Sequence, residues 1–236
     1  MIEVVPAIIA KDFHELEHEL MLVKGHVESV QIDVCDGKFV PTKSWPMRSD
    51  GDGYQFEFEN IISESKALPF WEDFNFEIDL MVARPEAVVE DWLRAGANAL
   101  IFHIECGNVV EKLIGNLRSR FPNDGSLGVR LGIALNPSTD NQKIAQCASL
   151  VDFIQCMGSD KLGHHGVSLD ERLYEKLAVL RKEYPTHIIS VDIGVDLETA
   201  PQLVSAGANK LISGSAIFES KNIAETIELL KKALQG

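Results

Sequence analysis

Short apolar runs alternate with amphipathic stretches along the whole chain, and each run has the length of a buried strand. The runs are continuous rather than alternating between apolar and polar residues, which is typical of parallel strands covered on both faces. They predict strands over residues 4–9, 27–34, 76–82, 99–104, 128–135, 150–157, 187–191 and 210–212. The stretches between them predict helices over residues 12–24, 85–95, 109–120, 169–183, 197–206 and 222–234. Eight strand–helix units of about 29 residues each predict an α/β fold, a (β/α)8 TIM barrel forming a single domain over residues 1–236.

The ends of the predicted helices carry residues that favour helix caps. Asp12, Ser168 and Asp196 precede predicted helices, where a side-chain oxygen can accept from a free backbone N–H. Gly96 and Gly207 follow predicted helices, where a left-handed residue often ends the helix. These caps support a regular strand–helix repeat.

One long segment, at about residues 36–58, interrupts the repeat. It is rich in Gly, Asp and Ser, contains Trp45, Pro46 and Tyr54, and follows the second predicted strand. Loops that follow strands form the active-site end of this barrel, and long loops there are commonly functional. We expect this segment to form a lid or one wall of a substrate site.

Composition and charge narrow the class of protein. The chain has 236 residues, 45% of them hydrophobic and 25% charged, which is ordinary for a globular protein and excludes disorder. Its formal net charge of -14 opposes binding to nucleic acid or to an anionic membrane surface. The four cysteines show no C-x-x-C spacing, and the first ten residues lack a basic leader. We therefore expect a cytoplasmic protein with reduced thiols.

Polar side chains stand at the ends of the predicted strands, where this fold places its chemistry. No G-x-G-x-x-G follows the first strand and no Walker motif occurs, so dinucleotide-binding and P-loop folds are excluded. The strand-end residues are Gln31, Asp33, Asp79, Met81, His103, Glu105, Asn136, Gln155, Met157, Asp192, Gly214 and Ser215. A carboxylate inside an apolar strand costs several kcal/mol unless it is paired, so the three aspartates predict a shared functional site.

Several segments, in order along nearly the whole chain, resemble the ribulose-phosphate 3-epimerase family. Residues 6–13 (PAIIAKDF) are similar to that family's P-S-I-L-S-A-D-F, and residues 31–41 (QIDVCDGKFVP) to its H-x-D-V-M-D-G-x-F-V-P. The segment 79–82 (DLMV) matches its H-L-M-V and is followed by a counterpart of its helix over residues 84–97. Further matches lie at residues 102–105, 135–139, 191–194 and 213–218.

The resemblance implies a (β/α)8 barrel that inverts one carbon of a ketopentose phosphate. It assigns Asp33 and Asp192 as the acid–base pair, one removing the proton alpha to the carbonyl and the other returning a proton from the opposite face. In the family these two aspartates and two histidines hold a divalent metal, but the histidine positions here are Gln31 and Asp79.

An all-oxygen set of Gln31, Asp33, Asp79 and Asp192 favours Mg²⁺ or Mn²⁺ over Zn²⁺. A metal-free site is the alternative. The three carboxylates would then repel, and at least one should be protonated near neutral pH.

The resemblance also implies where a phosphorylated sugar would bind. The family's flexible glycine-rich segment corresponds to residues 160–166, with Gly163 and Gly166 retained and His164 and His165 between them. Gly194, Gly214 and Ser215 are the expected phosphate contacts, and Met81 and Met157 are expected beside the substrate. The two histidines could replace the lost metal ligands or contact the phosphate.

Three functions stay open at this point. The first is a sugar-phosphate epimerase or isomerase. We expect such an enzyme to be a homo-oligomer. The second is a phosphosugar-binding homologue without activity, acting as a sensor or an assembly partner. The third is a decarboxylase or aldolase on a related barrel, which uses a D-x-K-x-x-D array. Asp36 and Lys38 match the first two positions of that array, but the last position is Pro41.

Overall fold

Eight parallel strands close into a barrel in which each strand pairs with its neighbour in sequence, and β1 pairs with β8. The computed structural model describes residues 3–122, 128–164 and 166–235. The strands are β1 (Glu3–Ile8), β2 (Ser29–Cys35), β3 (Asn75–Met81), β4 (Ala99–His103), β5 (Arg130–Leu135), β6 (Phe153–Met157), β7 (Ile188–Asp192) and β8 (Lys210–Ser213). The predicted barrel fold is confirmed.

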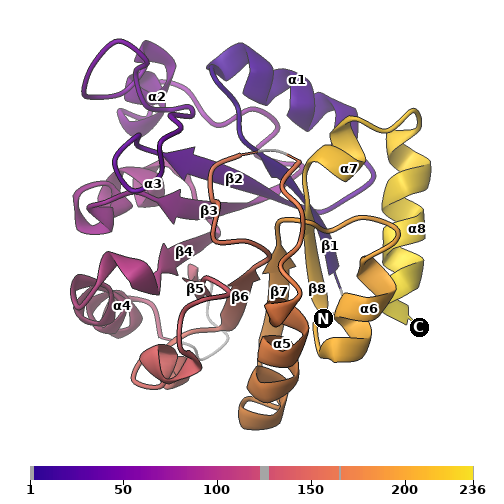
Figure 1. Ribbon diagram of the computed structural model, residues 1–236. Coiled ribbons are helices and arrows are strands. Elements are labelled where there is room, and N and C mark those ends of the chain that lie inside the picture. Colours follow the sequence, from indigo (N-terminus) through magenta and orange to yellow (C-terminus); the bar gives the residue numbers. More distant parts are fainter. Residues whose placement is uncertain (1–2, 123–127, 165, 236) are drawn as a thin grey trace.

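Helices surround the barrel on its outside (Figure 1). They are α1 (Phe13–Val23), α2 (Phe56–Ile62), α3 (Val89–Ala95), α4 (Val109–Arg120), α5 (Arg172–Glu183), α6 (Ala200–Ala206), α7 (Ser215–Phe218) and α8 (Ile223–Gln235). Short 3-10 turns lie at η1 (Pro85–Ala87), η2 (Ile104–Cys106), η3 (Asn141–Ile144) and η4 (Ala148–Leu150). Within the described residues, no helix is both long and apolar enough to cross a membrane.

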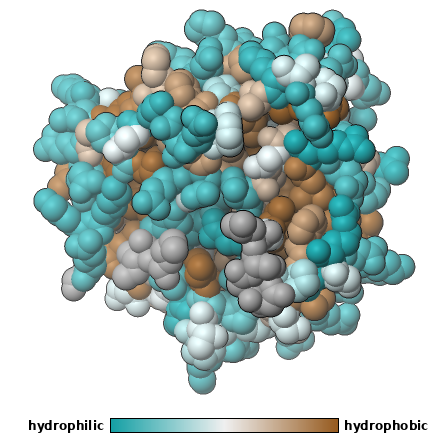
Figure 2. Space-filling view, turned by 180° about the vertical axis from the view of Figure 1, so that it is seen from behind, coloured by the Kyte–Doolittle hydropathy of each residue, from teal (hydrophilic) through white to brown (hydrophobic). Residues whose placement is uncertain are grey.

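Seen from behind, hydrophilic side chains cover most of the molecular surface, with hydrophobic side chains showing in separate areas between them (Figure 2). This distribution agrees with the large excess of acidic residues in the sequence.

Strand β2 shows why the strands read as continuous apolar runs. All seven of its residues are buried. Val30, Ile32 and Val34 belong to the large apolar layer between the strands and the helices. Gln31 and Asp33 alternate with them and are buried inside the barrel, because successive side chains point to opposite faces.

The amino-terminal end of the barrel is closed by a buried ion pair. Lys210 Nζ lies 2.5 and 2.6 Å from the two carboxylate oxygens of Glu77, and Arg130 Nη2 lies 2.7 Å from the first of them. The Phe153 ring packs beside Lys210, 5.0 Å from Nζ to the ring centroid, and also fills the space over Gly132, where a Cβ atom would lie 2.4 Å from the ring. These groups fix the strands far from the site end.

We expect Lys210→Met to lower the free energy of unfolding by about 3–5 kcal/mol, because it leaves the Glu77 carboxylate buried without its main partner. Urea denaturation measures the effect. The matched change Lys232→Met removes an exposed lysine of α8 and should shift stability by less than about 0.5 kcal/mol. Equal stability of the two variants would contradict the structural role of the pair.

Most predicted boundaries agree with the structure, but three helices begin later than predicted. Helix α3 begins at Val89, after the 3-10 turn Pro85–Ala87, and not at residue 85. Helix α5 begins at Arg172 and not at residue 169, so Ser168 is not its N-cap. Helix α6 begins at Ala200 with Thr199 as its N-cap, and Asp196 instead accepts from the backbone N–H groups of Glu198 and Thr199 in the turn before it. Before helices α5 and α6, polar residues form a turn, so the loop is longer and the helix shorter than predicted.

The other predicted caps are confirmed. Asp12 accepts from the backbone N–H of Glu15 at 2.9 Å, and Gly96 and Gly207 end their helices with positive φ angles of 95° and 125°.

The long segment after β2 contains a helix that the sequence pattern did not predict. Helix α2 begins at Phe56, inside the expected loop of residues 36–58. Before this helix, Met47 and Tyr54 form an isolated antiparallel bridge that closes a short loop. Trp45 packs edge-on against Phe58 and Trp92. Burial of these aromatic rings converts the end of the expected loop into an ordered element.

Candidate active site

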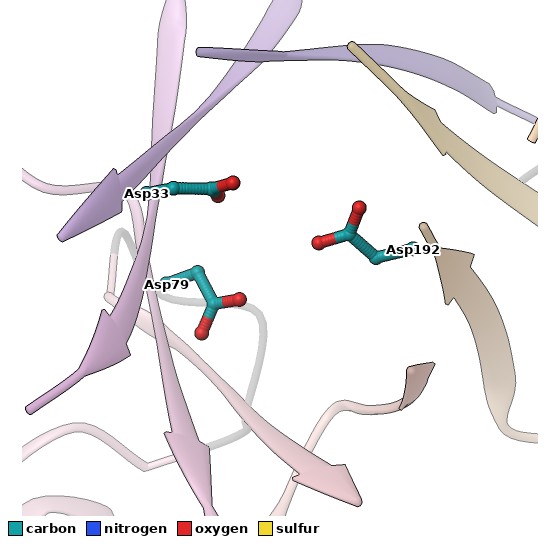
Figure 3. Close-up of side chains that lie close together, drawn as sticks. All are labelled: Asp33, Asp79 and Asp192. Atoms are coloured by element: carbon teal, nitrogen blue, oxygen red, sulfur yellow. The ribbon is translucent and has the colours of Figure 1, made fainter. Parts of the chain in front are cut away.

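Three buried aspartates meet inside the barrel at the carboxyl ends of their strands. Asp33 on β2 and Asp79 on β3 are direct neighbours across the sheet, and Asp192 ends β7. Figure 3 shows Asp192 pointing toward the other two from the opposite side. One carboxylate oxygen from each residue lies within 4.8 Å of the other two, and the three residues are 0–5% exposed. The predicted convergence of these side chains is present.

Two buried glutamine side chains lie between the carboxylates. Gln31 Nε2 donates to Asp33 Oδ1 at 2.7 Å and to Asp192 Oδ2 at 2.9 Å. Gln155 Nε2 on β6 lies 3.3 Å from Asp79 Oδ2 and 3.5 Å from Asp192 Oδ2, and its Oε1 accepts from Ser190 Oγ at 3.3 Å. These amide hydrogens partly offset the repulsion among three anionic groups.

A buried histidine supplies the nearest titratable nitrogen. His103 Nε2 lies 2.9 Å from Asp79 Oδ1, and both side chains are completely buried. The carboxylate acceptor requires Nε2 to carry the proton. Burial alone lowers the pKa of His103, but the charge of Asp79 and its hydrogen bond outweigh burial and raise that pKa above its usual value. Asp79 therefore has a potential cation as its partner.

The other two aspartates hold their protons more tightly than usual. Burial, followed by the charges of Asp192 and Asp79, raises the pKa of Asp33 well above its ordinary range. Burial and the Asp79 charge raise the pKa of Asp192 to about 7. A carboxyl group with a pKa near 7, such as that of Asp192, is suited to general acid–base catalysis at neutral pH.

We expect the metal-free protein to lose stability as the pH rises. The pKa of Asp192 is about 7 in the folded chain but near 3.8 in the unfolded chain. Between pH 4 and pH 7 the folded state therefore binds more protons than the unfolded state. The contribution of Asp192 to the free energy of unfolding is present below about pH 4 and is lost as the pH rises past 7. In chelator, Asp192→Asn should weaken this pH dependence, measured by thermal unfolding from pH 5 to 8, whereas the exposed Asp52→Asn should not. An unchanged profile in Asp192→Asn would contradict the raised pKa.

The residues fit a divalent metal ion. Three carboxylate oxygens converge, and Gln31 Oε1 is buried without a hydrogen-bond partner among the described residues. A half-turn of the Gln31 carboxamide exchanges its oxygen and nitrogen and would present Oε1 to the carboxylates. The donor set is then entirely oxygen, which hard cations prefer.

A cavity of about 560 Å³ opens above the aspartates. Asp33 and Asp192 contribute to its wall, whereas Asp79, which is completely buried, is not among the lining residues. The wall also contains the residues that the sequence predicted beside a substrate, namely Met81, Met157, Gly163, Gly166, Gly194, Gly214 and Ser215. Its volume is in the usual range for small-molecule sites.

The backbone after β7 shapes one side of this cavity. Ile193 adopts a positive φ of 75°, which is rare for a β-branched residue, and its N–H donates to Asp192 Oδ1 at 2.7 Å. Gly194 also has a positive φ, and a Cβ atom there would lie 2.9 Å from Leu169. This turn therefore orients Asp192 and requires glycine at position 194.

Some strand-end and loop residues lie outside the cluster. Glu105 accepts from the backbone N–H of Asn136 at 2.8 Å in a neighbouring loop contact. Lys38 is exposed and pairs with Asp52 at 3.1 Å, so it does not supply a lysine to the carboxylates. His164 is exposed and lines the cavity, while His165 lies outside the described residues.

The fold and the site together define a class of (β/α)8 barrel proteins in which carboxylates at the strand ends lie below a cavity of metabolite size. Residues 3–218 match the model of the ribulose-phosphate 3-epimerase family. The chain belongs to that family.

Individual relatives agree with this assignment. A ribulose-phosphate 3-epimerase of Treponema pallidum is 32% identical over 219 residues, covering 90% of this chain and 89% of the relative. A ribulose-phosphate 3-epimerase of Schizosaccharomyces pombe is 28% identical, covering 98% and 93%. Among solved structures, 3-hexulose-6-phosphate synthase from Salmonella typhimurium has a TM-score of 0.67 at 14% identity, covering 100% of this chain and 99% of that one. The structural similarity supports the barrel fold.

Sequence reasoning missed the contacts of His103 and Gln155 with the aspartates, although both were recognised at strand ends. Asp79 pairs with Ile101 across β3 and β4, so His103, two residues further along β4, points to the same face as Asp79. The available signal was a histidine inside an apolar strand next to a strand that carries an aspartate. Only the strand register shows that the two side chains meet.

Proposed function

We propose that this chain is a sugar-phosphate epimerase that inverts the carbon alpha to the carbonyl of a ketopentose phosphate. The observation that carries the proposal is that Asp33 and Asp192, from strands on opposite sides of the barrel, both reach the wall of one cavity. The pKa of Asp192, about 7, lets that carboxyl hold or release a proton near neutral pH. Burial and the neighbouring carboxylates raise the pKa of Asp33 well above its ordinary range.

In the reaction, one aspartate in its ionised form accepts the proton from the carbon alpha to the carbonyl. The electron pair of the broken C–H bond forms an enediolate. The other aspartate, protonated at the start, returns a proton to the opposite face of that carbon. The substrate leaves inverted, the two aspartates have exchanged protonation states, and reversal uses the same groups in opposite roles.

Asp33, Asp79 and Asp192, with the oxygen of Gln31, are proposed to hold a divalent cation, with Mg²⁺ or Mn²⁺ preferred to Zn²⁺. A cation held there supplies positive charge that stabilises the enediolate oxygens. Gln155 Nε2 contacts Asp79 and Asp192, and His103 Nε2 donates to Asp79, so these two residues keep the carboxylates in place when Gln31 turns its oxygen to the cation.

The side of the cavity formed by the loops after β6, β7 and β8 is proposed to receive the phosphate. Gly194, Gly214 and Ser215 line it from the loops after β7 and β8, and Gly163 and Gly166 line it from the loop after β6. Backbone N–H groups of such loops can bind an anion even though the chain is acidic overall. We further expect a homo-oligomer acting in the cytoplasm, where the four free cysteines would stay reduced.

The test incubates the protein with ribulose 5-phosphate and related ketose phosphates in the presence of Mg²⁺, Mn²⁺ or Zn²⁺. NMR of the epimerised carbon measures turnover. Epimerisation that depends on Asp33 supports the proposal. Because both histidine positions of the metal site are replaced by Gln31 and Asp79, a binding protein without activity is the second candidate. Thermal stabilisation by a ketose phosphate without any turnover would favour that candidate.

A further inference from the structure

The carboxylate of Asp79 is held at both of its oxygens. Oδ1 accepts from His103 Nε2 at 2.9 Å, and Oδ2 lies 3.3 Å from Gln155 Nε2. The same Gln155 nitrogen lies 3.5 Å from Asp192 Oδ2, so Asp79 Oδ2 faces the side of the cluster where Asp192 ends β7. The stronger of the two contacts, from His103, therefore decides which oxygen is left for the centre of the site.

The His103 ring is itself fixed from the other side. Phe39, in the loop after β2, packs on the ring with centroids 5.2 Å apart and planes tilted by 54°. Asp36 holds that loop, because its Oδ1 accepts from Phe39 N at 2.8 Å and its Oδ2 from Ala83 N at 2.9 Å. The second ring nitrogen, Nδ1, makes no hydrogen bond within the described residues, and its nearest acid is Glu105 Oε2 at 3.8 Å. Among the residues that the structure describes, Asp79 is thus the one hydrogen-bond partner of the His103 ring.

We propose that His103 is a positioning residue that holds Asp79 as a ligand of the metal site. By occupying Oδ1, it leaves Oδ2 on the side of the cluster where Gln155 Nε2 also contacts Asp192. Orienting partners of this kind commonly account for a 10–100-fold change in metal affinity. The inference deepens the proposed function and rests on it only in taking the three aspartates as a metal site.

The test measures Mn²⁺ binding without substrate, by the loss of the free-ion electron paramagnetic resonance signal. His103→Leu keeps the side-chain bulk but removes the donor, and we expect it to weaken Mn²⁺ binding about 10–100-fold. His103→Gln retains an N–H donor and should keep the affinity within about threefold. His103→Asn, whose amide is too short to reach Asp79, should behave like the leucine variant and replaces it if that variant does not fold.

The matched control is His187→Leu. His187 Nε2 bonds to the backbone oxygen of Ala148 at 3.0 Å, at the start of β7 and away from the aspartates. Loss of this bond removes a histidine contact of similar length, so Mn²⁺ affinity should stay within about twofold even if the melting temperature falls. In kinetics, His103→Leu should lower kcat and leave KM for the ketose phosphate within about threefold.

Mn²⁺ affinity that is equal in wild type, His103→Leu and His103→Asn would overturn the proposal. So would a wild-type protein that binds no Mn²⁺, whatever its turnover. A wild type that shows the His103 effect on Mn²⁺ binding but epimerises no ketose phosphate would refute only the proposed function.

Discussion

Asp33→Asn and Asp192→Asn should each lower kcat for epimerisation by about 10²–10⁴-fold, because each removes one of two acid–base groups that act on a single carbon. Both aspartates are only 4–5% exposed and line the cavity, so the amides should fit without displacing the backbone. Steady-state kinetics with purified variants measures the loss, and KM should change much less than kcat.

The two variants should differ in the proton exchange that they retain. In heavy water, a chain with one working aspartate can still remove and return a proton on its own face of the sugar. We therefore expect Asp192→Asn to incorporate deuterium at this carbon in one epimer and Asp33→Asn to incorporate it in the other. Neither variant should convert one epimer into the other at an appreciable rate. NMR detects the label directly.

Asp140→Asn serves as the control, since this exposed residue caps the short turn after β5 at the same end of the barrel. Its turnover should equal that of wild type. If either cavity aspartate could be replaced with less than a threefold loss of kcat, the two-base assignment would be wrong.

The fold could be predicted because parallel strands and their covering helices leave a simple pattern. Along β2 every residue is buried, so the sequence shows an apolar run even where Gln31 and Asp33 interrupt it. Helix α2 could not be predicted from the same pattern. It has seven residues and no side-chain cap, and it is stabilised by the packing of Phe58 against Trp45 and Trp92 rather than by local signals.

The site could be predicted only as far as strand ends determine it. The strand ends of a barrel gather at one end, and the three aspartates do meet there, whereas the strand-end residue Glu105 contacts a neighbouring loop instead. Which oxygen each partner occupies depends on register and side-chain geometry between residues far apart in sequence. Gln31 reaches Asp192 across 161 positions, and His103 reaches Asp79 from the next strand. Neither contact can be assigned from the sequence until the strand register is known.

Removal of divalent metal should lower turnover by about 10²–10³-fold, the effect of losing a preorganised positive charge next to an enediolate. Dialysis against a chelator followed by addition of one metal at a time measures this. Because the proposed ligands are all oxygen atoms, Mg²⁺ or Mn²⁺ should restore activity better than Zn²⁺. Full activity in chelator, with no metal found by elemental analysis, would refute the metal-dependent mechanism.

The variant Gln31→His/Asp79→His tests why the site should prefer Mg²⁺ or Mn²⁺ to Zn²⁺. It replaces two oxygen donors by imidazole nitrogens and removes one of the three negative charges in the cluster. Imidazole suits Zn²⁺, so the order of metals should reverse, with Zn²⁺ at least about tenfold better than Mg²⁺ in binding and in restoring turnover. The same variant also separates His103 from its carboxylate partner, which should loosen the ring that Phe39 contacts. A metal order unchanged from wild type would show that the donor atoms at positions 31 and 79, and the charge at position 79, do not select the ion.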